Sequence, residues 1–128
     1  MATMQVDLVS LERPVWSGQA TAVYARTPEG GIGIMPGHAP LLGALVPGWT
    51  VRIQRENESE LAFAVHGGFL SVDADGVSVL AELAEAAADI DVPRARAALA
   101  KLAGDDSPEA VAGRARAQAR LRAVGETV

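Results

Sequence analysis

Few residues of this chain have types and spacings that could carry chemistry. The sequence has no cysteine, which excludes disulfides and thiolate catalysis, and its two histidines stand far apart. A zinc site needs three or more ligands, and a catalytic serine needs a strained turn that none of the serines shows. We therefore expect no metal site and no catalytic residues. We expect His38 to bond locally in a loop or to contact a partner protein, and His66 to be a hydrogen-bonded residue at a strand end.

The last third of the chain holds a more suggestive set of one carboxylate and several guanidinium groups. Asp91 and Arg94 open one predicted helix, and arginines recur along the next. Guanidinium groups match phosphate oxygens in geometry and charge, and a carboxylate accepts hydrogen bonds from a ribose hydroxyl or an adenine amine. The pattern is compatible with nucleotide binding. A capping aspartate followed by solvated arginines explains the same pattern, and both interpretations stay open at this point.

Charge divides the chain unevenly around a net value of −5. Residues 1–88 hold ten Asp and Glu against four Arg, a balance of −6, whereas residues 89–128 hold six against seven Lys and Arg, a balance of +1. An acidic body argues against nucleic acid as the main partner, and the more basic tail suits an acidic surface or a phosphate. No stretch approaches the ~20 apolar residues of a membrane-spanning helix, and the N-terminus lacks the features of a signal peptide. The lack of cysteine fits a cytosolic protein.

Short apolar runs separated by turn signals predict an antiparallel sandwich or barrel over the first 80 residues. A tight corner from Pro36 to Pro40 lies between two of these runs, and Gly67–Gly68 predicts a bulge or bend. Trp16 and Trp49 lie near turns and could pack in the core or at an interface, and we favour the core. The predicted strands cover residues 4–11, 20–27, 32–35, 41–46, 49–55, 61–66, 69–72 and 77–80.

Beyond residue 80 the composition turns to helix formers. Propensity alone would begin a helix near Glu82, but Asp91 followed by Pro93 is a better start, and it predicts a helix over residues 92–103. Gly104 ends it, and Ser107 and Pro108 begin a second helix over residues 108–124. We therefore expect a β-domain of residues 1–88 followed by a helical hairpin of residues 89–128.

Residues 4 to about 98 resemble one known family, and four segments carry the resemblance in the same order along the chain. They are GIGIMPGHAPLL, VHGGFLSV, VSVLAELA and DIDVPRA. Together they resemble the epsilon subunit of the bacterial F-type ATP synthase. The resemblance implies a β-sandwich of about ten antiparallel strands followed by a two-helix hairpin. It also replaces the helix start near Glu82 with a continuous strand over residues 77–86.

The resemblance further implies a non-catalytic rotor subunit of the central stalk that couples rotation of the membrane c-ring to the gamma subunit. Its C-terminal helices would contact the alpha/beta hexamer and restrain ATP hydrolysis. The subunit would lie at the cytoplasmic face of the cell membrane as a peripheral part of the complex, with no direct membrane insertion. No cofactor is required, and ATP is expected only as a regulatory ligand. The alternative is a free-standing nucleotide-binding regulatory module.

Two sets of site residues follow from the resemblance. The family's ATP contacts correspond to Glu85, Ile90, Asp91, Arg94 and Ala95, with Arg114, Arg116 and Arg120 as further candidates. The subunit interface corresponds to Glu29, Gly30, Gly31, Pro36, Gly37 and His38. Gly31 stands where many relatives carry an acidic residue, so the contact with the c-ring would depend on Glu29 or on backbone groups. Pro93 departs from the family's ATP motif by stiffening the helix start.

Overall fold

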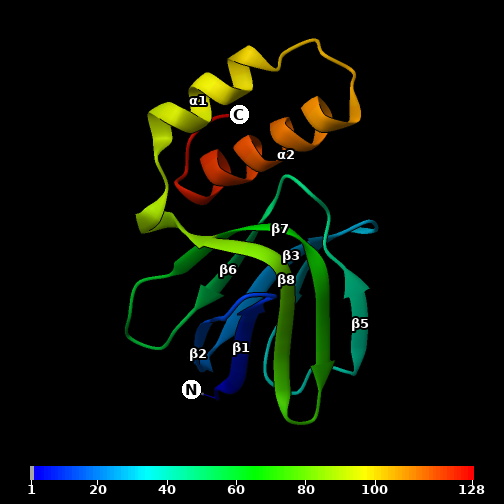
Figure 1. Cartoon of the computed structure of the whole chain (residues 1–128). Coiled ribbons are helices and arrows are strands. Elements are labelled where there is room, and N and C mark those ends of the chain that lie inside the picture. The colour runs from blue at the N-terminus through cyan, green and yellow to red at the C-terminus, as the bar shows by residue number, and fades with distance from the viewer. Residues whose placement is uncertain (1) are drawn as a thin grey trace.

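The computed structural model describes residues 2–128, in which eight strands precede two helices (Figure 1). The strands are β1 (Met4–Ser10), β2 (Pro14–Ala20), β3 (Ala22–Thr27), β4 (Gly30–Ile34), β5 (Leu41–Ala44), β6 (Thr50–Gln54), β7 (Leu61–Asp73) and β8 (Gly76–Ala86). A 3-10 turn, η1 (Ala87–Asp89), leads to α1 (Val92–Lys101) and α2 (Pro108–Ala123). The helices lie together across one end of the strands, away from the N-terminus.

The strands are hydrogen-bonded in the order β2-β1-β8-β7-β6-β3-β4, with β5 paired to β7 as well. Each pairing is antiparallel except that of β1 with β8, which is parallel. β7 pairs with β8 along most of its length, but its other edge is shared: β6 pairs with residues 61–64 and β5 with residues 69–72. This division of β7 lets the sheet fold over one aliphatic core, whose most deeply buried members include Leu8, Ile34, Ile53 and Leu70.

Gly67 and Gly68 bend β7 where its partner changes from β6 to β5. Both have positive φ, 74° and 132°, which a side chain would disfavour. A Cβ on Gly68 would lie 2.1 Å from the carbonyl oxygen of Leu80 in β8. The bend also exchanges the two faces of the strand, because Val65 points into the core before it and Leu70 points into the core after it. The predicted bend is confirmed, but it lies within one long strand instead of separating two.

Capping residues set the starts of both helices as the sequence predicts. The side chain of Asp91 accepts a hydrogen bond from the backbone N–H of Arg94, and that of Ser107 accepts one from Ala110. Gly104 and Gly125 follow the helices with positive φ. α2 lies between α1 and the sheet (Figure 1), and its contact with β7 centres on the buried alanines Ala64, Ala119 and Ala123.

Three strand predictions need correction. Residues 14–20 form an edge strand that the sequence analysis missed, because it exists through pairing with β1 and not through its own alternation. The helix start near Glu82 is wrong: residues 82–86 belong to β8, and the pairing of residues 83–86 with β7 overrides their helix propensity, as the resemblance implies. The described residues contain eight strands instead of about ten, partly because residues 61–73 are continuous.

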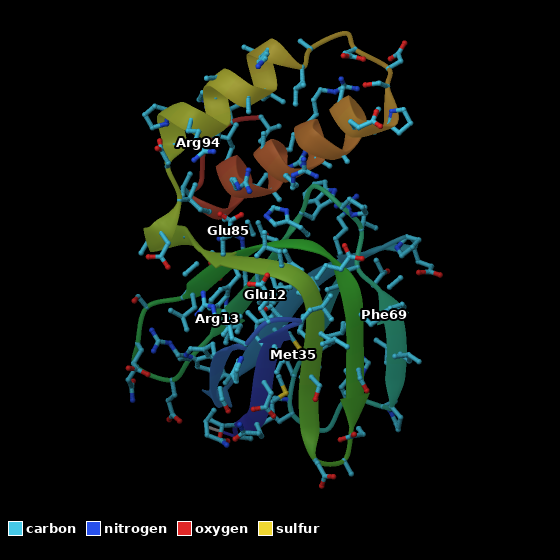
Figure 2. All side chains as sticks on the ribbon, viewed as in Figure 1. Glu12, Arg13, Met35, Phe69, Glu85 and Arg94 are labelled. Atoms are coloured by element: carbon cyan, nitrogen blue, oxygen red, sulfur yellow. The ribbon has the colours of Figure 1, made fainter. Side chains whose placement is uncertain are left out.

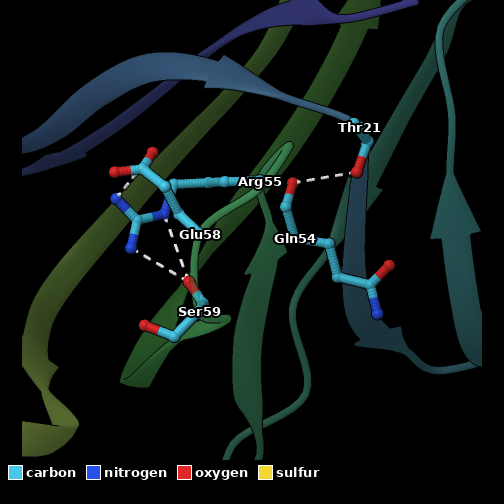
Figure 3. Close-up of polar contacts among 5 residues, drawn as sticks. All are labelled: Thr21, Gln54, Arg55, Glu58 and Ser59. Carbon is cyan, nitrogen blue, oxygen red and sulfur yellow. Dashed lines mark hydrogen bonds and ion pairs between the residues drawn. The ribbon is translucent and has the colours of Figure 1, made fainter. Parts of the chain in front are cut away.

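The polar segment between β6 and β7 is a hairpin loop in which Arg55 makes most of the polar contacts drawn in Figure 3. The Arg55 guanidinium donates to the carbonyl oxygen of Ser59 through Nε and Nη2 and pairs with the Glu58 carboxylate at 3.3 Å. Nearby, the Thr21 hydroxyl donates to the carbonyl oxygen of Gln54. The Arg55 contacts thus close the loop on itself, while the Thr21 contact joins the end of β6 to the start of β3.

Candidate functional site

A small polar pocket lies where the sandwich meets the hairpin formed by α1 and α2. The end of β8, η1, the first turn of α1 and one residue of α2 surround a cavity of about 230 Å³. In Figure 2, Glu85 lies at the sheet beneath the helices and Arg94 lies on α1 above it. The lining residues are Glu85, Asp89, Asp91, Arg94, Ala95 and Arg120. Five of them are among the eight that the resemblance names for ATP.

Glu85 is the hub of this pocket because one of its oxygens accepts two hydrogen bonds. Its Oε1 accepts from Nε2 of His66 at 2.8 Å and from Nε of Arg120 at 2.7 Å. Burial alone would raise the pKa of the Glu85 carboxyl, but the hydrogen bonds and charge of Arg120 and His66 outweigh it and hold the pKa below its usual value. Glu85 is therefore ionised at neutral pH and joins β7, β8 and α2.

His66 is buried beneath α2 and stays neutral at neutral pH. Burial lowers the pKa of its imidazole, and the charges of Arg120 and Arg116 lower it further, against the opposing effect of Glu85. Since Nε2 donates to Glu85, the neutral ring carries its lone pair on Nδ1. That Nδ1 atom is buried and has no hydrogen-bond partner in the described part of the chain. The predicted hydrogen bond is confirmed, but only one of the two ring nitrogens is satisfied, and His66 lies within β7 instead of at a strand end.

The remaining groups of the pocket suit a ligand that carries both hydroxyl or amine donors and an anion. Asp91 uses one carboxylate oxygen for the cap of α1, and the side chain of Arg94 is exposed beside it. Arg120 is already paired with Glu85, so Arg94 supplies the unshared positive charge, while Asp89 and Asp91 supply acceptors. A cavity of this size holds part of a nucleotide and leaves the rest in solvent.

Three of the residues named for ATP lie outside this pocket. Ile90 packs against the alanine contact between α2 and β7. Arg114 donates to the carbonyl oxygens of Leu102 and Asp105, so it fastens the loop between the helices. Arg116 lines a separate, mainly apolar groove of about 830 Å³ between α2 and β8.

The six residues named for the subunit interface form two groups at opposite ends of β4. Glu29 lies in the turn before this strand and Gly30 and Gly31 begin the strand, whereas the corner after it consists of Pro36, Gly37 and His38. A strand of five residues separates them by roughly 13 Å. The corner lines a cavity of about 540 Å³ with the β7–β8 turn and the start of β1. His38 is exposed and its Nδ1 lies 2.7 Å from the carbonyl oxygen of Ala39, so the expected local bond is present.

One contact between the hairpin and the sandwich went unrecognised in the sequence. The Trp49 ring lies between two guanidinium groups, with Arg26 4.2 Å and Arg122 3.9 Å from its centroid. Arg122 also donates to the carbonyl oxygen of Gly48, and Arg52 donates to the backbone carbonyl of Arg122. The helical spacing predicts that Arg122 points well away from the apolar face of α2, and it gives no sign of this contact. Trp16 packs against the main core, as expected.

The outer face of the sheet carries a row of exposed apolar residues, which we call the apolar stripe. Val9, Leu80, Phe69 and Ala44 lie directly opposite one another across β1, β8, β7 and β5, and Leu42 lies beside them. Phe69 is 56% exposed and Leu42 is 75% exposed. Figure 2 shows Phe69 away from the helices. Large apolar side chains that line up in this way mark an interaction surface.

The described residues hold neither a membrane-spanning helix nor a cluster of metal ligands. None of the helices there is long and apolar enough to cross a membrane. No group of three or more His, Cys, Asp or Glu within residues 2–128 is placed to hold a metal ion.

Comparison with known proteins gives a consistent set of relatives. The model of the ATP synthase Delta/Epsilon chain beta-sandwich domain matches residues 3–87. The chain is 54% identical over 124 residues to the ATP synthase epsilon chain of Rhodococcus erythropolis (strain PR4 / NBRC 100887), covering 97% of this chain and 98% of that one. It is 56% identical over 121 residues to that of Nocardia farcinica (strain IFM 10152), covering 94% and 89%.

Two solved structures share the fold. A chain in the Euglena gracilis mitochondrial ATP synthase matches with a TM-score of 0.79 at 22% identity, covering 98% of this chain and 83% of that one. A chain in the central stalk and c-ring of the Tetrahymena thermophila mitochondrial ATP synthase matches with a TM-score of 0.57 at 19% identity, covering 97% and 92%. The family model and both structures agree with the predicted sandwich.

Proposed function

The chain belongs to the ATP synthase delta/epsilon family, as an epsilon chain, and from that premise we propose that it is a non-catalytic rotor subunit of the central stalk. It would couple rotation of the c-ring to the gamma subunit from a peripheral position at the cytoplasmic face of the membrane. The titles of the matching structures name the c-ring and, in one case, the central stalk. They supply the setting of the proposal.

The apolar stripe is the observation that supports a gamma contact. Phe69, Leu80 and Val9 form a row of exposed apolar side chains on three neighbouring strands, and no described part of the chain covers it. Burying such a row against a partner removes apolar area from water at no cost in unpaired polar groups. We therefore assign gamma to this face. We assign two other parts of the stalk to residues 36–38 and to residues 29–31. These two groups lie at opposite ends of β4, so one small contact cannot include both.

Capture of gamma tests the assignment. The chain is co-expressed with gamma and purified through a tag on gamma, as wild type, Phe69→Glu and Met35→Glu. Phe69→Glu places a charge in the stripe and is expected to reduce captured chain at least tenfold. Met35 is similarly exposed at 47% but lies outside the stripe, so its variant controls for surface charge. Capture of Phe69→Glu at the wild-type level would mean that gamma binds another face. If the wild-type chain does not co-purify with gamma at all, the rotor role is excluded.

A regulatory nucleotide site is a second proposal, supported by the convergence of Asp91, Arg94 and Glu85 on one cavity. The carboxylates would accept from ribose or adenine, and Arg94 would contact phosphate. Arg114 and Arg116 drop out of this proposal because they lie elsewhere. The test is calorimetric titration of ATP into wild type, Arg94→Ala and Arg96→Ala. Arg96 pairs with Glu126 outside the pocket and serves as the matched control. Equal heats for all three, or none, count against the site.

We also propose that residues 1–88 and 89–128 act as separate units, of which the second contacts the alpha/beta hexamer and restrains hydrolysis. A chain ending at residue 88 should still bind gamma through the stripe. In the assembled complex it should raise ATP hydrolysis. Unchanged hydrolysis would argue against an inhibitory hairpin and leave the gamma contact intact. A chain that binds ATP but never joins the complex would favour the free-standing module instead.

A further inference from the structure

His66 lies at the junction between the sheet and the hairpin. Its side chain is 8% exposed because α2 covers it, and its Nε2 donates to Oε1 of Glu85. The same Glu85 oxygen accepts from Arg120 of α2. One carboxylate oxygen thus links the buried imidazole of β7 to the hairpin.

The rest of the hairpin contact is weak in apolar terms. The buried side chains shared by α2 and β7 are Ala64, Ala119 and Ala123, which carry one methyl group each. The partly buried Ala87 and Ile90 pack against them. Alanine removes little apolar area from water, so docking depends heavily on polar contacts such as those of Arg120 and Arg122. A change of charge beneath α2 therefore acts on a contact whose favourable free energy of docking is small.

The nearest groups around His66 mostly disfavour a positive charge there, and Glu85, the nearest group that favours it, is already paired with Arg120. Nδ1 is buried without a partner, so an imidazolium would add a second N–H with no acceptor in the described residues. Arg116 and Arg120 of α2 repel it. Glu85 of β8 attracts it but is shared with Arg120. Glu82 of β8 and Asp106 before α2 line the same groove as His66, but from exposed positions where water screens their charge.

We propose that protonation of His66 releases the hairpin from the sandwich, so that acidification shifts the chain from the docked to the undocked form. In the undocked form the arginines of α2 leave and water reaches Nδ1. The undocked form therefore binds the proton more tightly. This switch does not depend on the gamma contact proposed above, but it shares Glu85 and Arg120 with the nucleotide pocket, which undocking would open.

The sign follows from the lowered pKa of His66 in the docked form. Burial is the main cause of that lowering, and undocking returns the pKa toward the ordinary value of 6.5. The contribution of neutral His66 to docking is present above pH 6.5 and is lost as the pH falls below it. The undocked-to-docked ratio rises up to about tenfold for each unit by which the two pKa values differ. Glu85 stays ionised in this window because its pKa lies below 4.5.

The experiment follows hairpin docking in the full chain between pH 8 and pH 5. NMR reads the amide of Ala119 for docking and the two imidazoles for titration, and Trp49 fluorescence gives a second signal for release of Arg122. The wild type is expected to undock progressively below pH 6.5. In His66→Gln the side-chain amide still donates to Glu85 but does not titrate, so docking should be independent of pH. His38→Gln should behave as wild type because His38 is exposed and far from the hairpin.

Two results would overturn the proposal. One is an acid transition of the same size in His66→Gln. The other, which needs no variant to fold, is a wild-type His66 that titrates at or above 6.5 while the hairpin is docked. A hairpin that stays docked in wild type down to pH 5 has the same meaning as the second result.

Discussion

The outer face of β7 and β8 has two halves. In contrast to most protein surfaces, the covered half carries small or polar side chains and the exposed half carries large apolar ones. On the half next to the hairpin, α2 covers small or polar side chains, chiefly Ala64, His66 and Glu85. On the other half, the large apolar Phe69 and Leu80 face solvent. Gly67–Gly68 separates the halves. The covered contact consists of small apolar side chains and a few charged hydrogen bonds, whereas the bare half exposes larger apolar side chains.

This arrangement fits a hairpin that can leave and a partner that stays. Helices of 10 and 16 residues are marginal on their own and need packing to persist. The alanine contact and a few charged hydrogen bonds hold the two helices on the sheet with only a small favourable free energy. The predictions below test whether the two halves differ in this way, beginning with the residue that separates them.

Gly68→Ala is expected to have the largest effect, because it removes the bend that divides the face. The new Cβ would lie 2.1 Å from a backbone oxygen of β8 and would also occupy a φ of 132°. We expect a loss of about 4 kcal/mol in the free energy of unfolding, measured by urea denaturation. The control is Gly31→Ala, where the Cβ meets nothing within 4 Å, and it should change stability by less than about 0.5 kcal/mol. Similar losses in both variants would show that the bend tolerates a side chain.

Glu85→Ala is expected to weaken the covered half selectively. It leaves His66 without its acceptor and Arg120 without its ion pair, at a cost of about 2 kcal/mol to hairpin docking. Amide hydrogen exchange along α2 measures this cost, since local opening sets the exchange rate. Glu82→Ala is the control, because Glu82 is exposed on the same strand and faces the groove. Equal acceleration of exchange in both variants would mean that Glu85 does not hold the hairpin.

The pH limit of the same contact follows from the lowered pKa of Glu85. The stability that ionised Glu85 contributes is present above pH 4.5 and is lost as the pH falls through the lower pKa of the folded form. Glu85→Ala should therefore flatten the pH dependence of docking below pH 4.5. His66→Gln should leave that acid limb in place.

Arg122→Ala should have a smaller effect on the same half. It removes one guanidinium from the face of Trp49, worth about 1 kcal/mol, together with a hydrogen bond to Gly48. Faster exchange along α2 and a shift in Trp49 emission report the loss. Arg96→Ala, which breaks an exposed pair with Glu126, should shift neither by a comparable amount. An unchanged emission spectrum in Arg122→Ala would place the indole in another environment.

The sequence predicted those parts of the fold that depend on local chemistry. Asp91 and Ser107 cap their helices as expected, because a cap is an interaction over three residues. Residues 82–86 form a strand against their propensity, and residues 14–20 form one without a clear pattern, because pairing with a distant strand decides both. Residue spacing alone cannot show such pairing, although the resemblance did recover the first of the two.

The candidate site divides in the same way. Glu85, Asp91, Arg94 and Ala95 come together because the end of β8 leads directly into α1. The side chains of α2 were harder to place, since the rotation of that helix is set by its packing and its alanine-rich sequence gives a weak apolar face. Arg120 reaches the pocket, Arg114 fastens a loop, and Arg122 contacts Trp49.

Leu80→Ser should have the smallest effect on the isolated chain, and for that reason it separates the two halves most sharply. Leu80 is 48% exposed on the bare half and packs against no covering element, so we expect a change of less than about 0.5 kcal/mol in the free energy of unfolding. Its neighbour Val79 is 1% exposed, and Val79→Ser should cost several times more. If gamma binds at the apolar stripe, Leu80→Ser should weaken the capture of gamma while leaving the fold intact. A loss of stability comparable to that of Val79→Ser would instead mean that the stripe is held within the chain, and the contrast between the two halves would have to be abandoned.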